Sequence, residues 1–161
     1  MTPSTEQLLS LPTLSDQRVP EDHIDQNGHM NIAHYFREGS IGAWRLVVDR
    51  ATGEDYIERR GLSLFTVEHR IAYLGELRAG ERYSVHATVV ARTDKAVHTV
   101  AFVVDRERDR VACRMELVYV HVDMEHRRAA SIPDDVAASL DEVASEHPWV
   151  AEVATGLSLR R

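Results

Sequence analysis

Residues 23–39 read HIDQNGHMNIAHYFREG, a polar segment that runs directly into a helical pattern. A polar Asp-Gln-Asn-Gly segment leads at once into apolar residues that recur at helical spacing between Ile32 and Val47. Asn31 stands where an N-cap residue would satisfy the first amides of the helix. Gly39 and Gly42 each cost about 1 kcal/mol relative to alanine inside a helix, so their presence predicts a sheet packed tightly against it.

From residue 62 onward the chain alternates apolar and polar residues with a period of two. This alternation predicts strands at residues 62–74, 81–91, 96–104 and 111–122, after a short extended piece at 17–20 that Pro20 limits. Short polar turns separate the long strands, which predicts an antiparallel meander. A second helix is expected from Pro133, because the two aspartates that follow it suit a first turn.

The order of these elements predicts an α+β fold in which a curved antiparallel sheet wraps around one long helix. We expect a single domain at residues 16–147, preceded by a loosely ordered arm at 1–15 and followed by a tail at 148–161. The leucines of the arm, Leu8, Leu9, Leu11 and Leu14, indicate that it docks somewhere. Residues 49–61 are expected to form a loop with a turn of helix.

The amino-acid composition argues against some classes of binding partner and location. The chain has 161 residues and a formal net charge of −7, which argues against nucleic acid because phosphate binding needs a basic face. Apolar runs stay below about 18 residues, so no membrane span is expected. The first residues lack the basic and apolar regions of a secretory signal, so a reducing cytoplasm is the expected location. The single cysteine, Cys113, is expected to be a buried and inert thiol.

Three motifs carry a resemblance to a known family. Residues 25–35 match the pattern D-x-x-G-H-x-N-x-x-x-Y, residues 73–81 resemble Y-L-x-E-L-x-x-G-D with Glu81 in the last place, and residues 122–133 resemble a closing strand of that family. Over residues 16–133 the chain resembles hotdog-fold acyl-CoA thioesterases of the 4-hydroxybenzoyl-CoA thioesterase type. It departs from them at His23, where many relatives carry a second acid, and at Ile32, where a second asparagine is common.

The resemblance implies a fold and an activity. The fold is the hotdog, a long central helix wrapped by a curved sheet, and the activity is hydrolysis of an acyl-CoA thioester to a free acid and CoA. CoA enters as part of the substrate, and no separate cofactor is implied. The sequence is also similar to small thioesterases of carnitine breakdown that act on betainyl-CoA. Tyr35, Trp44, Phe65 and Tyr73 are candidates for an aromatic cage around such a quaternary ammonium group.

Candidate catalytic groups gather at the entrance of the long helix. The first amides of a helix lack intrahelical partners and lie at the positive end of its dipole, so the N–H groups around Gly28 and His29 are candidate oxyanion donors. Gly28 would also let the backbone approach a ligand closely. The resemblance implies that Asp25 is catalytic, either attacking the carbonyl or activating water. Its residue type alone also allows Asp25 to cap the turn before the helix.

Each neighbouring candidate has a structural interpretation as well. The His29 side chain can polarise the substrate or pack under the helix, Asn31 can cap the helix or contact substrate, and Tyr35 can belong to the core or to a pocket wall. Glu68 is a second candidate acid, which assists only if its face of the strand turns to the helix entrance. His69 must then face the opposite way, because neighbours in a strand alternate.

Cations that hold the CoA phosphates are expected in loops and at strand ends. We expect Arg60, Arg127 and Arg128 to bind substrate, although a residue of this type in a loop is more often a solvated surface charge. The nine histidines are scattered without the spacing of metal ligands, so no metal site is expected.

One hotdog unit leaves a strand edge open, so we expect at least a homodimer, or a dimer of dimers, with active sites at the interface. Two alternatives stand beside hydrolysis. One is an acyl-CoA hydratase or dehydratase, although such enzymes usually show a different histidine-centred signature. The other is a non-catalytic acyl-CoA-binding protein.

Overall fold

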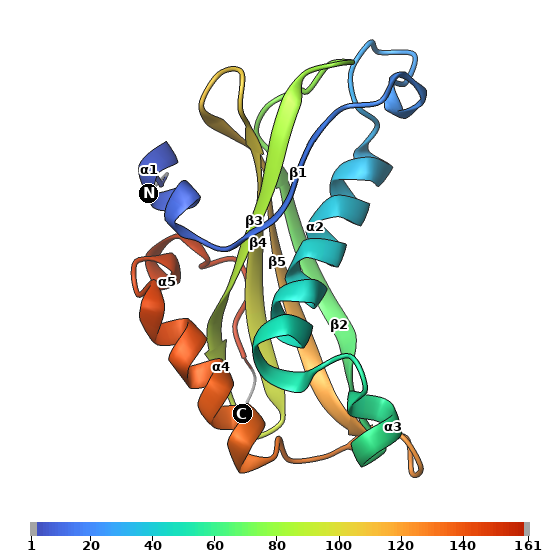
Figure 1. Cartoon of the computed structure of the whole chain (residues 1–161), viewed down its shortest axis with the longest axis vertical. Coiled ribbons are helices and arrows are strands. Elements are labelled where there is room, and N and C mark those ends of the chain that lie inside the picture. Colours follow the sequence, from blue (N-terminus) through green and yellow to red (C-terminus); the bar gives the residue numbers. More distant parts are fainter. Residues whose placement is uncertain (1–2, 160–161) are drawn as a thin grey trace.

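Helix α2 (Ile32–Val47) lies across one face of a curved antiparallel sheet in the computed structural model, which describes residues 3–159 (Figure 1). Asn31 is its N-cap, with the side-chain oxygen accepting the Ala33 amide at 2.9 Å. A Cβ placed on Gly42 would lie 2.6 Å from Cγ1 of Val85 on the sheet. The helix therefore begins where the sequence predicts, and its glycine permits the close approach of the sheet.

Within residues 3–159, six strands form the sheet: β1 (Thr13–Arg18), β2 (Leu62–Tyr73), β3 (Arg82–Arg92), β4 (Ala96–Asp105), β5 (Arg110–Asp123) and the short β6 (Arg128–Ala129). Their order is β1-β3-β4-β5-β2, with β6 beside β5, and all pairs are antiparallel. The four long strands confirm the predicted ones to within one residue at each end. The expected α+β arrangement of a curved sheet around one long helix is confirmed.

The predicted meander is wrong at one place. β3, β4 and β5 follow one another as expected, but β2 pairs with β5 and not with β3. Residues 74–81 connect β2 to β3, and we name them the crossing segment. Leu77 in its middle is fully buried beside Met30 and Tyr35, and its carbonyl accepts the Met30 amide at 2.8 Å. Burying Leu77 at the helix entrance carries the chain across the end of the sheet, where a tight turn would have returned it to β2.

Both ends of the chain are folded onto the domain where the structure describes them. α1 (Thr5–Ser10) and α5 (Val150–Val153) contribute to an apolar cluster on the sheet face opposite α2, whereas α4 (Asp134–Glu146) joins α2 in the main core. The arm expected to be loosely ordered is ordered, because Leu8 and Leu11 are at most 2% exposed in that cluster.

Short helical turns fill the remaining connections. A 3-10 turn (Glu21–His23) precedes the entrance of α2, and a π-helical turn (Val48–Thr52) and α3 (Tyr56–Arg60) follow its end. The segment at 49–61 is therefore more helical than the single turn expected there. Across residues 3–159, none of the helices combines the length and the apolar character needed to cross a membrane.

Candidate active site

Asp25 organises the turn that leads into α2. Its Oδ1 accepts the Asn27 amide at 2.8 Å, and its backbone carbonyl accepts the Gly28 amide at 3.0 Å. Gly28 has a φ of 81°, a left-handed conformation that glycine adopts without strain. The glycine is therefore required by the shape of the turn. The expectation that its amide is a free oxyanion donor is wrong, because the turn already uses that amide.

The second carboxylate oxygen of Asp25 faces the helix cap. Asn31 donates its side-chain N–H to Oδ2 of Asp25 at 3.4 Å, while its own oxygen caps the helix. Asn31 is thus confirmed as a cap, and it also orients the aspartate. The contact to Oδ2 is long, and within residues 3–159 it is the one hydrogen bond that this oxygen makes. That oxygen therefore keeps capacity for a further partner.

Two amides at the helix entrance, those of His29 and Ile32, have no hydrogen-bond partner in the part of the chain that the structure describes. Both residues line a cleft of about 210 Å³. The His29 side chain is half-buried in the cleft wall, with Nδ1 at 3.3 Å from the Met30 carbonyl. The unpaired donors at the positive end of the helix dipole thus border an open space.

The cleft lies between the helix entrance and the crossing segment. The residues that line it come from both sides: His29, Met30, Ile32, Tyr35, Tyr73, Gly75 and Glu76. Tyr35 joins the two sides, because its hydroxyl accepts the Leu77 amide at 2.9 Å and donates to the Gly75 carbonyl at 3.2 Å. Burial raises the pKa of Tyr35 to about 12, so the hydroxyl keeps its proton at neutral pH. Tyr35 therefore belongs to the core and to the cleft wall.

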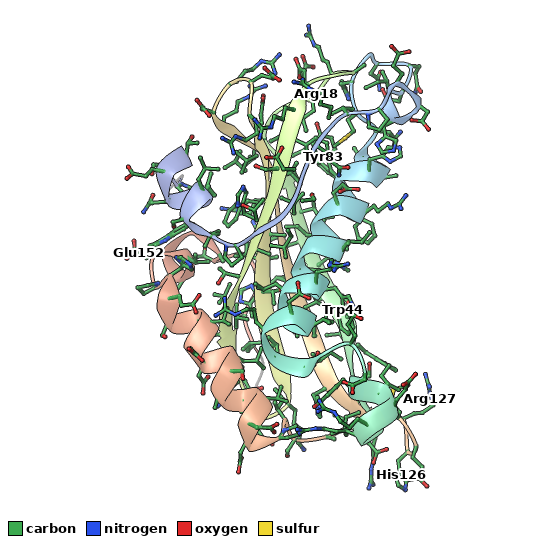
Figure 2. The ribbon with its side chains drawn as sticks, viewed as in Figure 1. Arg18, Trp44, Tyr83, His126, Arg127 and Glu152 are labelled. Carbon is green, nitrogen blue, oxygen red and sulfur yellow. The ribbon has the colours of Figure 1, made fainter. Side chains whose placement is uncertain are left out.

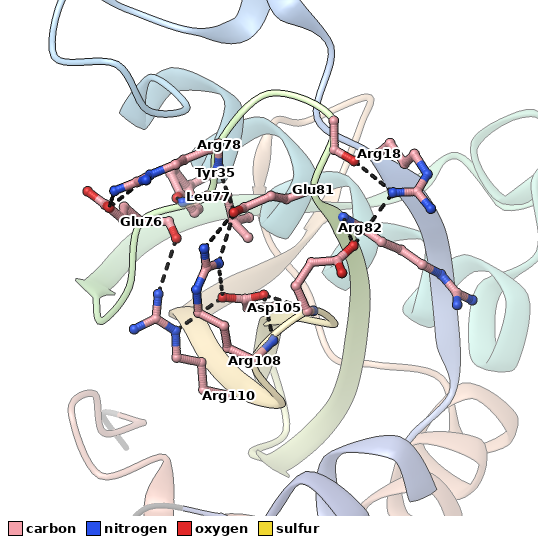
Figure 3. Close-up of polar contacts among 12 residues, drawn as sticks. Arg18, Tyr35, Glu76, Leu77, Arg78, Glu81, Arg82, Asp105, Arg108 and Arg110 are labelled. Atoms are coloured by element: carbon pink, nitrogen blue, oxygen red, sulfur yellow. Dashed lines mark hydrogen bonds and ion pairs between the residues drawn. The ribbon is translucent and has the colours of Figure 1, made fainter.

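A network of charged side chains around Asp105 binds the crossing segment (Figure 3). Asp105 is fully buried, and its Oδ2 accepts hydrogen bonds from Arg108 at 3.0 Å and Arg110 at 3.1 Å. Arg110 also donates to the Glu76 carbonyl at 3.3 Å, and Arg108 pairs with Glu81. Burial by itself would raise the pKa of Asp105, but hydrogen bonds from the two guanidinium groups and from the Glu107 and Arg108 amides together hold that pKa below its ordinary value. An ionised carboxylate thus anchors one wall of the cleft.

Glu76 is the acid that sequence reasoning missed. Arg78 donates to its Oε1 at 2.6 Å, and within residues 3–159 its Oε2 has no partner. The hydrogen bond from Arg78 lowers the pKa of Glu76, so the carboxylate is ionised at neutral pH. The available signal was its fourth place in the Y-L-x-E-L pattern. In a loop, however, no period shows where a side chain points.

Glu68 lies on the sheet face opposite α2. It pairs with Val118 and lines a separate cavity of about 510 Å³, whereas His69 pairs with Leu117 of the core and lies against α2. The two side chains face opposite ways, as predicted. The condition for Glu68 to assist at the helix entrance is not met within one chain. A β-bulge between Thr66 and Glu68 shifts the alternation at this point.

The arginines expected to bind CoA lie at the other end of α2. Arg60 pairs with Asp135, and the guanidinium of Arg127 lies 5.4 Å from the centre of the Phe65 ring. Arg128 begins β6, and both Arg127 and Arg128 are exposed. Figure 2 shows Arg127 at the end of the molecule away from the entrance of α2. One chain therefore does not bring these cations to the cleft.

The expected aromatic cage is divided between three places. Tyr35 and Tyr73 meet at the cleft, with ring centroids 5.7 Å apart. Trp44 lies beside Tyr119 further along α2, and Phe65 lies under Arg127. The four aromatic residues therefore do not form one cage, although two of them stand beside the candidate oxyanion donors.

Comparison with known proteins places this site in a family context. The model of the thioesterase-like superfamily matches residues 19–140. An L-carnitine dehydrogenase/betainyl-CoA thioesterase of Ruegeria pomeroyi is 30% identical over 151 residues, which cover 93% of this chain and 29% of that protein. A betainyl-CoA thioesterase of Pseudomonas aeruginosa is 25% identical over 137 residues, which cover 85% of this chain and 86% of that protein. The chain spans less than a third of the relatives named for both activities.

A solved structure extends the comparison to the fold. A hypothetical protein from Staphylococcus aureus in complex with CoA superposes with a TM-score of 0.80 at 20% identity, covering 93% of this chain and 97% of that chain. Likeness at this identity shows the fold, and the hotdog architecture expected from the motifs is confirmed. The family match likewise confirms the thioesterase family that the motifs indicate.

Proposed function

The chain belongs to the thioesterase-like superfamily, and from that premise we propose that it hydrolyses acyl-CoA thioesters with Asp25 as the catalytic carboxylate. The helix entrance carries this proposal, because the unpaired amides of His29 and Ile32 border a cleft and a carboxylate stands on the adjoining turn. The carbonyl oxygen of the thioester would lie against these amides, where donors aimed at a developing oxyanion lower the barrier.

Two routes lead to the same products. In one route Asp25 takes a proton from water while the water oxygen attacks the carbonyl carbon. In the other route the carboxylate of Asp25 attacks that carbon, and water then cleaves the resulting anhydride. In both routes the carbon–sulfur bond breaks, CoA leaves as a thiolate that takes up a proton, and the free acid remains. Asn31 acts as a positioning residue in either route, because it donates to Asp25.

Substitution of Asp25 tests the proposal. Asp25→Asn keeps an oxygen that can accept the Asn27 amide, so it preserves the turn and removes the base or nucleophile. We expect thiol release from acyl-CoA to fall at least about 100-fold in Asp25→Asn and in Asp25→Ala. Asp22→Asn, at an exposed carboxylate of the same loop, is the matched control and should keep wild-type turnover. Wild-type turnover in Asp25→Ala would overturn the assignment.

The working unit is at least a homodimer in this proposal. β2 is an edge strand, and in the described part of the chain no strand pairs with its outer side. Beside that edge, α2 exposes Phe36, Ile41 and Trp44, and β2 exposes Val67. A second copy that continues the sheet from β2 would cover these apolar side chains. Light scattering at micromolar concentration should give at least twice the mass of one chain, and a monomeric mass would count against the dimer.

The dimer would also give a role to Arg127 and Arg128, which lie far from the cleft of their own chain. A two-fold axis pairs the two β2 strands antiparallel. The end of β2 that borders the cleft in one copy then lies near the beginning of β2 in the other copy. Arg127 and Arg128 follow β5 at the beginning of β2, because Leu62 pairs with Asp123. This arrangement supports a role for these two arginines in holding CoA phosphates across the interface.

A further inference from the structure

The site proposed above gives no role to His23, where the sequence departs from an acid common in the resembled family. The His23 ring lies face to face with the ring of His34, with centroids 3.6 Å apart and planes inclined by 9°. A separation of this size is close to the optimum for dispersion attraction. Within residues 3–159 the buried Nδ1 of His23 has no hydrogen-bond partner. The contact, which we name the histidine stack, joins the 3-10 turn to the first turn of α2.

Both residues of the histidine stack are hydrogen-bonded to Asn31 through the backbone. The His23 carbonyl accepts the Asn31 amide at 2.9 Å, and the His34 amide donates to the Asn31 carbonyl at 3.0 Å. Asn31 in turn donates its side-chain N–H to Oδ2 of Asp25 at 3.4 Å. The Asp25 amide donates to the His29 carbonyl at 3.1 Å, which closes the same loop. The distance between the two stacked rings therefore bears on where Asn31, and with it the Asp25 carboxylate, is held.

The histidine stack accommodates one positive charge better than two. Two protonated rings at this separation repel each other, because a like charge nearby disfavours the charged form. The charged groups near the His34 ring come from the 3-10 turn and from α2: Asp22, Arg37 and Glu38. Burial, and after it the charge of His23, lowers the pKa of His34 below its ordinary value of 6.5, although the two carboxylates oppose this. The second proton therefore enters the stack only in acid solution.

We propose that His23 and His34 are positioning residues whose stack holds Asn31 and Asp25 in place for thioester cleavage and opens when both rings are protonated. The inference rests on the proposed thioesterase function and adds two residues and an acid sensitivity to the same site. Neither histidine belongs to the lining of the cleft, so both act through Asn31. The stack is complete above pH 6.5 and is lost as the pH falls through the lower pKa of the stacked His34.

The pH dependence of kcat tests the acid sensitivity. His34→Phe keeps a ring in the stack and removes its proton. Thiol release is followed with dithiodipyridine, on whichever of acetyl-, octanoyl-, benzoyl- and betainyl-CoA the wild-type protein cleaves fastest. Between about pH 7.5 and about pH 5 we expect kcat to fall at least about 3-fold more in the wild-type protein than in His34→Phe. Protonation of Asp25 contributes equally to both profiles. His147→Phe, at the end of α4, is the matched control and should keep the wild-type profile.

Removal of the ring tests the positioning role. His34→Ala should lower kcat at least about 5-fold at neutral pH with little change in KM, and His34→Phe should restore most of the loss. Circular dichroism checks that both variants are folded. Full neutral activity in His34→Ala would overturn the positioning role, and equal pH profiles in the wild-type protein and His34→Phe would overturn the acid sensitivity.

A third measurement needs no turnover. The pKa of the His34 ring, followed by proton NMR, should rise in His23→Phe, because the neighbouring positive charge is removed; we expect at least about a 3-fold gain in proton affinity. An unchanged pKa would overturn the coupling of charge between the two rings. Absence of thiol release from all four esters would overturn the thioesterase function and the positioning role together, whereas the NMR titration would still decide whether the two rings share one proton.

Discussion

The polar and charged groups at the two ends of α2 differ in whether other groups of the protein already bind them. At its beginning, polar groups are left with open capacity: the amides of His29 and Ile32, one oxygen of Asp25 and one oxygen of Glu76 border or adjoin a cleft. At its end, charge is matched by charge, as in the pair of Arg60 with Asp135, or is exposed to solvent. Groups that a fold leaves unsatisfied in a cavity point to chemistry, whereas satisfied or solvated groups point to stability or to a surface.

Distance separates the two ends within one chain. α2 has 16 residues, and a helix of that length spans about 24 Å. Cations at its end therefore serve the cleft at its beginning only when they come from a second copy. Substitutions at each end of α2 test this difference.

Asp105→Asn should have the largest effect on stability, because Asp105 is fully buried and binds two guanidinium groups behind the cleft. We expect the free energy of unfolding, measured in urea, to fall by about 3 kcal/mol. Asp135→Asn removes a carboxylate of the exposed pair at the other end and should leave the free energy of unfolding nearly unchanged, because solvent screens the pair. Equal losses in the two variants would contradict the contrast between the ends.

The same carboxylate predicts a pH dependence. Burial tends to raise the pKa of Asp105, but hydrogen bonds from the guanidinium groups and from two backbone amides together hold it below its ordinary value of 3.8. Its contribution to stability is therefore complete above pH 3.8 and is lost as the pH falls through the lower pKa of the folded state. Urea unfolding at a series of acidic pH values should show a steeper loss in the wild-type protein than in Asp105→Asn. Parallel curves would remove Asp105 as the cause.

Ile41→Asp tests whether a second copy brings the cations at the end of its α2 to the cleft of the first copy. Ile41 is 45% exposed in one chain, so an aspartate there is tolerated by a monomer but would be buried without a partner in the proposed interface. We expect a monomeric mass in light scattering and at least about 10-fold slower thiol release. Ala138→Asp, on the exposed side of α4, adds the same charge elsewhere and should change neither quantity. A dimeric, fully active Ile41→Asp protein would refute this interface.

Arg127→Ala and Arg128→Ala should have the smallest effect. Both side chains are exposed, so each substitution is expected to raise KM for acyl-CoA about threefold to tenfold with little change in kcat. The corresponding acyl-pantetheine ester lacks the nucleotide phosphates and should show no change. Arg60→Ala should matter less for KM, because the guanidinium of Arg60 is bound to Asp135. An equal rise in KM for the pantetheine ester would show that these arginines do not contact the nucleotide.

Much of the local structure could be predicted from the sequence. The helical spacing after Asn31 and the alternation from residue 62 locate α2 and the four long strands, because each pattern reports which residues must be buried. The strand pattern does not report neighbours, so the pairing of β2 with β5 was not predictable from it. The bulge beside Glu68 is also not visible in the strand pattern. One extra residue at the bulge reverses which face of the sheet the following side chains occupy.

The family motifs, the central helix with its cap, and the turn at Asp25 and Gly28 can all be recognised in the sequence, because each depends on residues close together in the chain. The tertiary structure decided which groups meet: it brought Tyr73 and Glu76 to the helix entrance, turned Glu68 away from it, and bound Arg60 to α4. The physical reason is the burial of Leu77, an interaction between distant residues that directs the crossing segment and so places the second wall of the cleft.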